Sequence, residues 1–410
     1  LAHAQKAVHL LHAQIAFQVG VNARNFTQKG RLVVAQGVFD FAQFDAKATD
    51  FDLIVDAAVE FEIAVRAVTD EVTGSVKTGA GFVAERVGNE FLGSQFGAVQ
   101  IATGDADAAD ALQYSTTEGY MALRKYISER YKTVKGLNIE PKNILITTGS
   151  QQGLDLLGKT FLNENDRVIL EKPGYLGAIQ LFSIYKARFS PVTLNSDGLD
   201  LAELTKASSL RNTKLMYTVP NFQNPTGITY SDKNREAIAE ILRGKPLMLI
   251  EDDPYGDLRY TGSHQSSFMH YLPEQTILLG SFSKTVVPSF RTGWIVAPDE
   301  IMEKLIIAKQ ASDLHTNYFT QKLLVEYLQN NDLNDHINKI KEVYGRQCMA
   351  MIESLKRHFP ENVEYTLPEG GMFLWVTLPK GISAMELFQE AIKQDVAFVP
   401  GDPFYTNSKE

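Results

Sequence analysis

The chain has 410 residues, of which 44% are hydrophobic and 22% charged, and its net charge is −9. This length allows two domains, and the composition is that of an ordinary globular protein. The negative charge excludes a general attraction to nucleic acid or anionic membrane. Cys348 is the only cysteine, which rules out an intrachain disulfide and a cysteine-based metal cluster. Without an apolar run of transmembrane length or an export signal, we expect a cytoplasmic protein.

The first 110 residues differ in composition from the rest. They contain no Pro, Tyr, Met, Trp or Cys, whereas the remainder carries all 15 prolines and all 16 tyrosines. They hold 8 Lys and Arg against 14 Asp and Glu, a net charge of −6. Two interpretations are open: an independent accessory segment, or an aberrant stretch from a misplaced start or reading frame. We favour the second, since the chain also begins with Leu1 rather than Met.

From residue 112, strand-like and helix-like runs alternate, as a parallel α/β sheet requires. Apolar runs predict buried strands at 143–148, 167–171, 214–219, 247–251, 277–280 and 294–297. Helical patterns begin at residue 149 and cover 175–185 and 232–242. Strands outnumber the helices between them near residue 290, so we expect one antiparallel pair. The fold class is therefore α/β, with a mostly parallel sheet of the seven-stranded type and flanking helices.

After residue 299 the pattern changes to a long helix at 335–357, a strand at 373–377 and a helix at 384–393. These elements predict a small C-terminal α/β domain. We therefore divide the chain into an atypical segment at 1–110, a large domain at 111–330 and a small, truncated domain at 331–410.

Polar residues follow several of the predicted strands, where open α/β sheets bind ligands. Gly149, Ser150 and Gln151 close a strand and open a helix. Their backbone N–H groups and the helix dipole predict an anion site, and a plain helix N-cap is the alternative. Asn224 follows another strand as a rigid side-chain donor, although Asn-Pro-Thr-Gly is also an ordinary turn sequence.

Paired carboxylates, Asp252 among them, follow a run apolar enough to be a central buried strand. Carboxylates there are costly unless they meet a cation or a hydrogen-bond donor. A metal site is one alternative, but no His or further acid falls at a supporting spacing. A protonated pyridine nitrogen would satisfy Asp252, and Tyr255, three residues on, is placed to reach a phenolic oxygen of the same ring.

The run Ser281-Phe282-Ser283-Lys284 precedes Arg291 by seven residues. Hydroxyls and a guanidinium suit a phosphate dianion, and positive charge keeps a nearby amine partly neutral for covalent chemistry. Alone, the run is equally typical of a Ser/Lys turn after a buried strand. With the polar residues upstream, it predicts pyridoxal phosphate (PLP) as the cofactor.

In this order the motifs resemble the fold-type I PLP-dependent aminotransferases of class I/II, over roughly residues 112–410. Ser150-Gln151, residues 251–255 and residues 281–294 are most similar to the branch with aminoadipate, kynurenine and multi-substrate aminotransferases. The resemblance implies the PLP-dependent transferase fold, PLP as cofactor and no metal. It also implies transfer of an amino group from an L-amino acid to a 2-oxo acid, in amino acid metabolism and biosynthesis.

The resemblance assigns catalysis to Lys284, Asp252 and Tyr255. Lys284 would hold PLP covalently and move the proton of the substrate Cα, while Asp252 would pair with the ring nitrogen. Asn224 and Tyr255 would bind the ring's phenolate oxygen.

The resemblance also implies a phosphate site at the helix start. The groups that would form it are Gly149, Ser150, Gln151, Ser281, Ser283 and Arg291. Tyr175 would lie flat against the cofactor ring; one more tyrosine at a helix start is the alternative. Tyr114 would reach the phosphate of a neighbouring subunit in a homodimer, and a surface tyrosine before a helix cap is the other interpretation.

Two family features are not recognisable. Residues 1–110 show no N-terminal arm or closing loop, and the arginine that grips the substrate carboxylate would lie beyond Glu410. We therefore expect PLP binding with weak transamination. The alternatives are an inactive PLP-binding fragment, a decarboxylase or lyase on the same fold, and an aminotransferase-like transcription regulator. The net charge of −6 over residues 1–110 argues against a DNA-binding segment.

Overall fold

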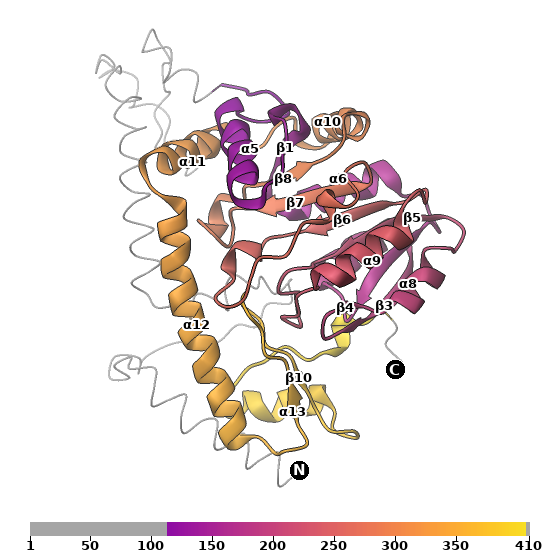
Figure 1. The fold of residues 1–410 in the computed structure, drawn as a ribbon, viewed down its shortest axis with the longest axis vertical. Coiled ribbons are helices and arrows are strands. Elements are labelled where there is room, and N and C mark those ends of the chain that lie inside the picture. The colour runs from indigo at the N-terminus through magenta and orange to yellow at the C-terminus, as the bar shows by residue number, and fades with distance from the viewer. Residues whose placement is uncertain (1–112, 407–410) are drawn as a thin grey trace, which may run out of the picture.

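A computed structural model describes residues 113–406 of the chain. Its central feature is an eight-stranded sheet with the strand order β1-β8-β7-β6-β5-β2-β3-β4 (Figure 1). In chain order the strands are β1 (Ile144–Thr147), β2 (Arg167–Lys172), β3 (Arg188–Asn195), β4 (Gly198–Leu199), β5 (Thr213–Thr218), β6 (Met248–Asp252), β7 (Thr276–Ser281) and β8 (Gly293–Val296). The segment at 1–110 and the expectations about Glu410 lie outside the described residues.

Strand direction confirms a mostly parallel α/β sheet and corrects one detail. We expected a single antiparallel pair, but β8 is antiparallel to both β1 and β7, and β4 is antiparallel to β3. The pairs β7–β6, β6–β5, β5–β2 and β2–β3 are parallel. The sheet has one strand more than expected: β4 has only two residues, too few to give a recognisable hydrophobic pattern.

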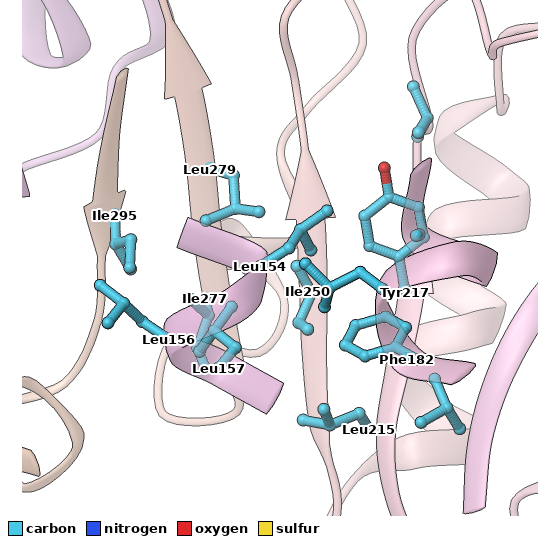
Figure 2. Close-up of a cluster of buried hydrophobic side chains, with 14 of the residues drawn as sticks. Leu154, Leu156, Leu157, Phe182, Leu215, Tyr217, Ile250, Ile277, Leu279 and Ile295 are labelled. Atoms are coloured by element: carbon cyan, nitrogen blue, oxygen red, sulfur yellow. The ribbon is translucent and has the colours of Figure 1, made fainter. Parts of the chain in front are cut away.

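Helices cover both faces of the sheet. They are α5 (Met121–Lys135), α6 (Gly149–Phe161), α7 (Leu176–Ile184), α8 (Leu201–Ala207), α9 (Asp232–Leu242), α10 (Asp299–Asp313) and α11 (Tyr318–Asn330). Leu215 and Tyr217 of β5 pack with residues of α6 and α7 on one face (Figure 2), whereas Met216 packs with residues of α8 and α9 on the other. Burial on both faces explains why these strands read as continuous apolar runs.

The strand β3 escaped the sequence analysis because it contains Pro191. Proline lacks the N–H that a sheet ladder needs, so it argues against a strand. The outer neighbour of β3, β4, pairs only with Leu194 and Asn195. Beside Pro191 the outer edge of β3 has no strand partner within residues 113–406, and a backbone nitrogen that faces such an edge makes no ladder bond.

The C-terminal part contains the long helix α12 (Leu333–His358), the short strands β9 (Glu364–Tyr365) and β10 (Val376–Thr377), and α13 (Ala384–Ile392). The strand predicted at 373–377 is thus confined to its last two residues. The segment before β10 is joined by backbone hydrogen bonds to the segment that follows β6. Tyr260 N donates to Glu369 O at 2.9 Å, and Gly371 N donates to Leu258 O at 2.9 Å. No helix within residues 113–406 is both long and apolar enough to cross a membrane.

Candidate active site

The predicted site residues follow strands that end at one edge of the sheet. Because β8 is antiparallel to both β1 and β7, the strand β1 runs in the same direction as β7, β6, β5 and β2. The carboxyl ends of these five strands therefore share an edge, which is where open α/β sheets bind ligands. Gly149 follows β1, Tyr175 follows β2, Asn224 follows β5, Asp252 ends β6 and Lys284 follows β7.

The start of α6 forms a cradle beside Arg291. Gly149 has φ +76°, and a Cβ built on it would lie 2.6 Å from the Arg291 Nη2. The cap residue Thr148 makes no side-chain bond to the first turn, so its side chain does not cap the helix N–H groups. Gly293 also lies close, since a Cβ there would be 2.7 Å from Ser150 N. A helix start with a guanidinium beside it is an anion site.

The two serines of the 281–284 run lie together. Ser281 Oγ donates to Ser283 Oγ at 2.9 Å and accepts from Ser283 N at 3.0 Å. These bonds shape the turn after β7 that carries the half-buried Lys284. Since β7 is the neighbour of β6, Lys284 follows the strand adjacent to the one that ends in Asp252.

Asp252 is buried and has one satisfied oxygen. Its Oδ2 accepts a hydrogen bond of 2.8 Å from the Tyr217 hydroxyl, whereas its Oδ1 is buried without a hydrogen-bond partner among residues 113–406. Burial raises the pKa of the Asp252 carboxyl to about 7, and the Tyr217 bond opposes that rise. A buried acceptor without a partner is costly in a folded protein, so this oxygen points to a ligand.

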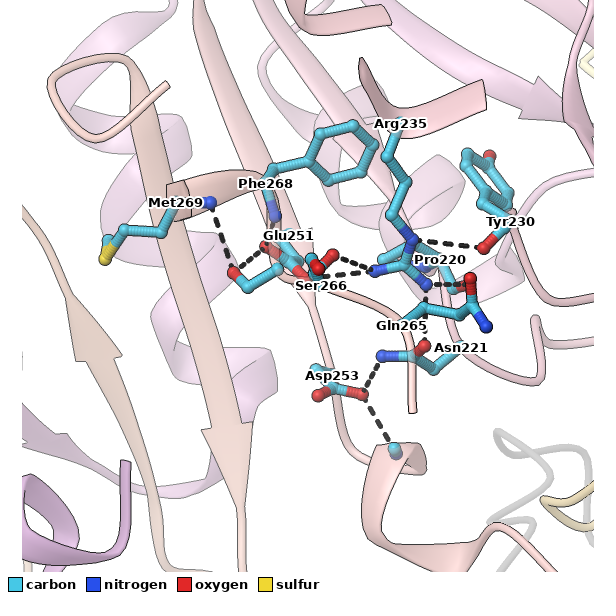
Figure 3. Close-up of polar contacts among 12 residues, drawn as sticks. Pro220, Asn221, Tyr230, Arg235, Glu251, Asp253, Gln265, Ser266, Phe268 and Met269 are labelled. Carbon is cyan, nitrogen blue, oxygen red and sulfur yellow. Dashed lines mark hydrogen bonds and ion pairs between the residues drawn. The ribbon is translucent and has the colours of Figure 1, made fainter. Parts of the chain in front are cut away.

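The neighbouring carboxylates, Glu251 and Asp253, have protein partners instead (Figure 3). Glu251 accepts from Ser267 Oγ at 2.6 Å and lies 3.7 Å from Arg235. Burial would raise the pKa of Asp253, but Lys135 and Asn221 outweigh burial and lower it. Of these three acids, only Asp252 has a buried oxygen without a hydrogen-bond partner in the part of the chain that the structure describes. Within residues 113–406, no group of three or more His, Cys, Asp or Glu side chains is arranged to hold a metal.

The turn that carries Asn224 is fixed by Gln223. The Gln223 Nε2 donates to Glu171 Oε2 at 2.9 Å and to Pro173 O at 2.9 Å, and its Oε1 accepts from Thr226 Oγ1 at 2.7 Å. Asn224 Oδ1 is buried and has no hydrogen-bond partner in the described part of the chain. Rotation of the amide exchanges its oxygen and its NH2 group, so either can face a ligand.

Three predicted tyrosines occupy different environments. Tyr175 caps α7 and stacks on Tyr217, with ring centroids 6.3 Å apart and planes at 28°. Tyr255 is buried and meets Phe373 edge-on at 5.4 Å. Tyr114 is 82% exposed, and its ring meets His315 at 5.7 Å. Of the helix-start residues, Gln151 turns its amide to Gly177 O at 3.1 Å, which leaves its backbone N–H for the cradle.

The sequence analysis missed Tyr217 and the pair Glu171–Gln223. Tyr217 lies in a predicted apolar strand, and nothing in the sequence indicates that its hydroxyl reaches the next strand. Glu171 is an acid at the end of a predicted apolar strand, and a buried acid requires hydrogen-bond partners. That signal could have identified it.

Comparison with known proteins decides the family. The family model described as "Aminotransferase class I and II" matches residues 88–410, beginning earlier than the predicted residue 112. The chain belongs to the class I and II aminotransferases. This aminotransferase is 40% identical over 308 residues to an aromatic-amino-acid aminotransferase of Thermococcus litoralis, covering 73% of each chain. It is 40% identical over 301 residues to a 2-aminoadipate transaminase of Thermus thermophilus, covering 72% of this chain and 74% of that protein.

Solved structures support the same family. The kynurenine aminotransferase of Pyrococcus horikoshii matches with a TM-score of 0.69 and 40% identity, over 74% of this aminotransferase and 76% of that chain. HTH-type transcriptional regulators match at a lower identity of 28%. The family and these relatives identify the chain as a PLP-dependent enzyme that transfers an amino group from an amino acid to a 2-oxo acid.

The described residues fit PLP. Among residues 113–406, Asp252 Oδ1 has no partner and suits a protonated ring nitrogen. Asn224 Oδ1 also has none there, and rotation of this amide would turn its NH2 group to a ring oxygen. The cradle at Gly149 and Arg291 suits a phosphate, and a side chain at residue 149 would fill it. A ligand with a phosphate, a ring nitrogen and a ring oxygen would satisfy all three groups.

Proposed function

We propose that this aminotransferase works through Lys284, Asp252 and Tyr255 at the sheet edge. The observation that carries the proposal is the buried Asp252 Oδ1, which has no hydrogen-bond partner among residues 113–406. It lies at the end of β6, adjacent to the strand from which Lys284 emerges. When bound, PLP supplies an electron sink that makes the substrate Cα proton acidic.

The residues have separate tasks in the transfer. Lys284 would hold the cofactor through its amine, and as a free base this amine would move the proton from the substrate Cα to the cofactor's C4′. The Asp252 carboxylate holds a proton at the ring nitrogen by charge and hydrogen bonding. Asn224 and Tyr255 bind the ring oxygen, and Tyr175 packs against the ring face. These assignments account for the polar groups that follow β2, β5, β6 and β7.

The phosphate is proposed to lie in the cradle at the start of α6. The backbone N–H groups of Ser150 and Gln151 point along the helix axis, and Arg291 supplies the compensating charge. The hydroxyls of Ser281 and Ser283 lie at the end of β7, where Ser281 pairs with Gly293 of β8. A Cβ on Gly293 would be 2.7 Å from Ser150 N, so this end of β7 lies beside the start of α6. Phosphate binding at this place anchors the cofactor while its other end reacts.

We further propose a cytoplasmic homodimer that serves amino acid metabolism. The support for a dimer is Tyr114. It matches a family position that reaches the phosphate of a neighbouring subunit, and in the single chain it is 82% exposed. The support for a cytoplasmic location is the single cysteine, which suits a reducing compartment. We also propose that the chain divides into a segment at 1–110, a large domain at 111–330 and a small domain at 331–410.

The proposal is tested with the purified full chain, PLP and a panel of L-amino acids. A donor should change the absorbance of the bound cofactor and release a 2-oxo acid, and a second 2-oxo acid should restore the absorbance. Release of CO2 without a 2-oxo acid would identify a decarboxylase. Unchanged absorbance with every donor would support the inactive PLP-binding alternative.

A further inference from the structure

Tyr217 donates a hydrogen bond to Asp252, the residue proposed to bind the ring nitrogen of PLP. Its hydroxyl lies 2.8 Å from Asp252 Oδ2, across 35 residues of sequence, and both groups are buried. The bond occupies one carboxylate oxygen, and the other, Oδ1, has no hydrogen-bond partner in the described part of the chain. The Tyr217 hydroxyl therefore determines which oxygen is available to a ligand.

The Tyr217 ring is held from two sides. Only 1% of the residue is exposed. Its ring lies beside the Phe182 ring (Figure 2). Tyr175 stacks on its ring at 6.3 Å, and Phe182 of α7 meets it at 6.3 Å with planes at 70°. Aromatic neighbours of this kind fix a ring in one orientation. The hydroxyl is therefore presented to Asp252 from a rigid support rather than from a mobile side chain.

The proton of this bond stays on Tyr217. Burial first, and then the charge of Asp252, keep the pKa of the Tyr217 hydroxyl well above its usual value. Asp252 faces three titratable groups in the described part of the chain: Tyr217 favours the ionised carboxylate, whereas Asp253 and Glu171 disfavour it. Tyr217 is thus the group here that offsets burial and keeps Asp252 available as an anion.

We propose that Tyr217 is a positioning residue that orients the Asp252 carboxylate and keeps it ionised, so that Oδ1 can bind the protonated ring nitrogen of PLP. The inference rests on the proposed role of Asp252. Without the hydroxyl, the carboxylate can rotate, and its charged form loses a hydrogen bond. Both effects weaken the interaction with a cationic ring nitrogen.

The test is Tyr217→Phe, which removes the hydroxyl and keeps the ring stacked on Tyr175. We expect PLP to bind at least about tenfold more weakly near neutral pH, because a bond to a charged group is lost. The deficit should shrink as pH rises from about 6 to about 8.5, since Asp252 ionises at higher pH in the variant than in the wild type. With PLP saturating, kcat should fall while the KM for the amino acid changes little.

The matched control is Tyr185→Phe. Tyr185 also donates to an aspartate, at 2.6 Å from Asp155 Oδ1, but this pair joins α6 to the end of α7. The control should leave the affinity for PLP and its pH dependence unchanged. Equal losses of affinity in both variants, or a Tyr217→Phe deficit that is independent of pH, would overturn the inference.

A parallel Asp252→Asn variant separates the inference from the proposed function. If Asp252→Asn keeps the wild-type affinity and pH profile, the role of Asp252 fails, and the inference about Tyr217 fails with it. If Asp252→Asn loses affinity and Tyr217→Phe does not, only the inference is wrong. Direct binding of PLP to the cofactor-free protein, measured by equilibrium dialysis, reads all three variants without relying on activity.

Discussion

At the residue scale, the ionised Asp252 carboxylate destabilises the folded cofactor-free protein. Burial raises the pKa of its carboxyl from 3.8 to about 7. Between these values the folded protein binds a proton that the unfolded chain does not. The associated stabilisation is fully present below about pH 4 and is lost as pH rises toward 7. At neutral pH the cofactor-free protein therefore carries an unfavourable buried charge, as binding sites often do.

Asp252→Asn should consequently stabilise the cofactor-free protein above neutral pH while reducing turnover at least about a hundredfold. The melting temperature should rise by about 2–4 °C for each kcal/mol gained, and the gain should vanish toward about pH 4. Thermal melts across pH measure the first effect and initial rates the second.

The matched control is Asp253→Asn at the adjacent position. The pKa of Asp253 is lowered because Lys135 and Asn221 outweigh burial. Its stabilisation is present above its usual pKa of 3.8 and is lost as pH falls through the lower folded value. Asp253→Asn should therefore destabilise the protein at neutral pH. The same sign for both substitutions would contradict this account of the two carboxylates.

At the element scale, the β1–α6 connection depends on Gly149. Gly149→Ala introduces a Cβ at φ +76° and forces the Arg291 guanidinium away from a contact of 2.6 Å. We expect PLP affinity to fall about ten- to a hundredfold, because a charge-assisted contact to phosphate is displaced. Gly244→Ala is the control, since Gly244 has φ +72° but no heavy atom within 4 Å of the added Cβ.

Both glycine substitutions should lower stability by about 1 kcal/mol through backbone strain. Only the change at Gly149 should alter PLP binding. Equal affinity for PLP in the two variants would show that the cradle is not the phosphate site.

The connection between β2 and the Asn224 turn depends on Gln223. Gln223→Leu would leave Glu171 and Thr226 short of hydrogen-bond partners, each at a cost of about 1–3 kcal/mol. Glu171 also accepts from Tyr230 at 2.7 Å, so it should stay in place while the Asn224 turn becomes more mobile. We expect lower stability together with a lower kcat.

Gln275→Leu provides the comparison for this loss. The Gln275 Nε2 donates to Lys245 O at 2.9 Å and clamps the turn after α9, away from the sheet edge. It should reduce stability with an unchanged kcat. If both substitutions reduce kcat in proportion to stability, Gln223 has no specific role in the site.

At the scale of the whole molecule, the proposed homodimer predicts shared active sites. Co-expression of Tyr114→Phe and Lys284→Ala chains should give hybrids in which one site combines an intact Lys284 with an intact Tyr114. Purified hybrids should exceed the activity of both parent homodimers. Activity no higher than the average of the parents would place Tyr114 outside the neighbouring site, and light scattering would show whether a dimer forms at all.

The sequence was informative where local signals agree with the fold. Helix α9 was predicted with its observed ends, because Ser231 caps it by accepting from Asn234 N and an amphipathic face follows. The order of the strand-end motifs led to the family. Local signals do not record contacts between strands, so the Tyr217–Asp252 bond and the Gln223–Glu171 bond emerged only from the three-dimensional arrangement. At β3, Pro191 was misleading because an open edge tolerates it.

The central claim is that Lys284 carries the cofactor. Reduction of the PLP-loaded full chain with borohydride, followed by proteolysis and mass spectrometry, fixes the cofactor to whichever lysine holds it. The account predicts a phosphopyridoxyl group on Lys284 and its absence from the Lys284→Ala variant. A label on a different lysine, such as the buried Lys309, or an unlabelled wild-type chain would contradict it.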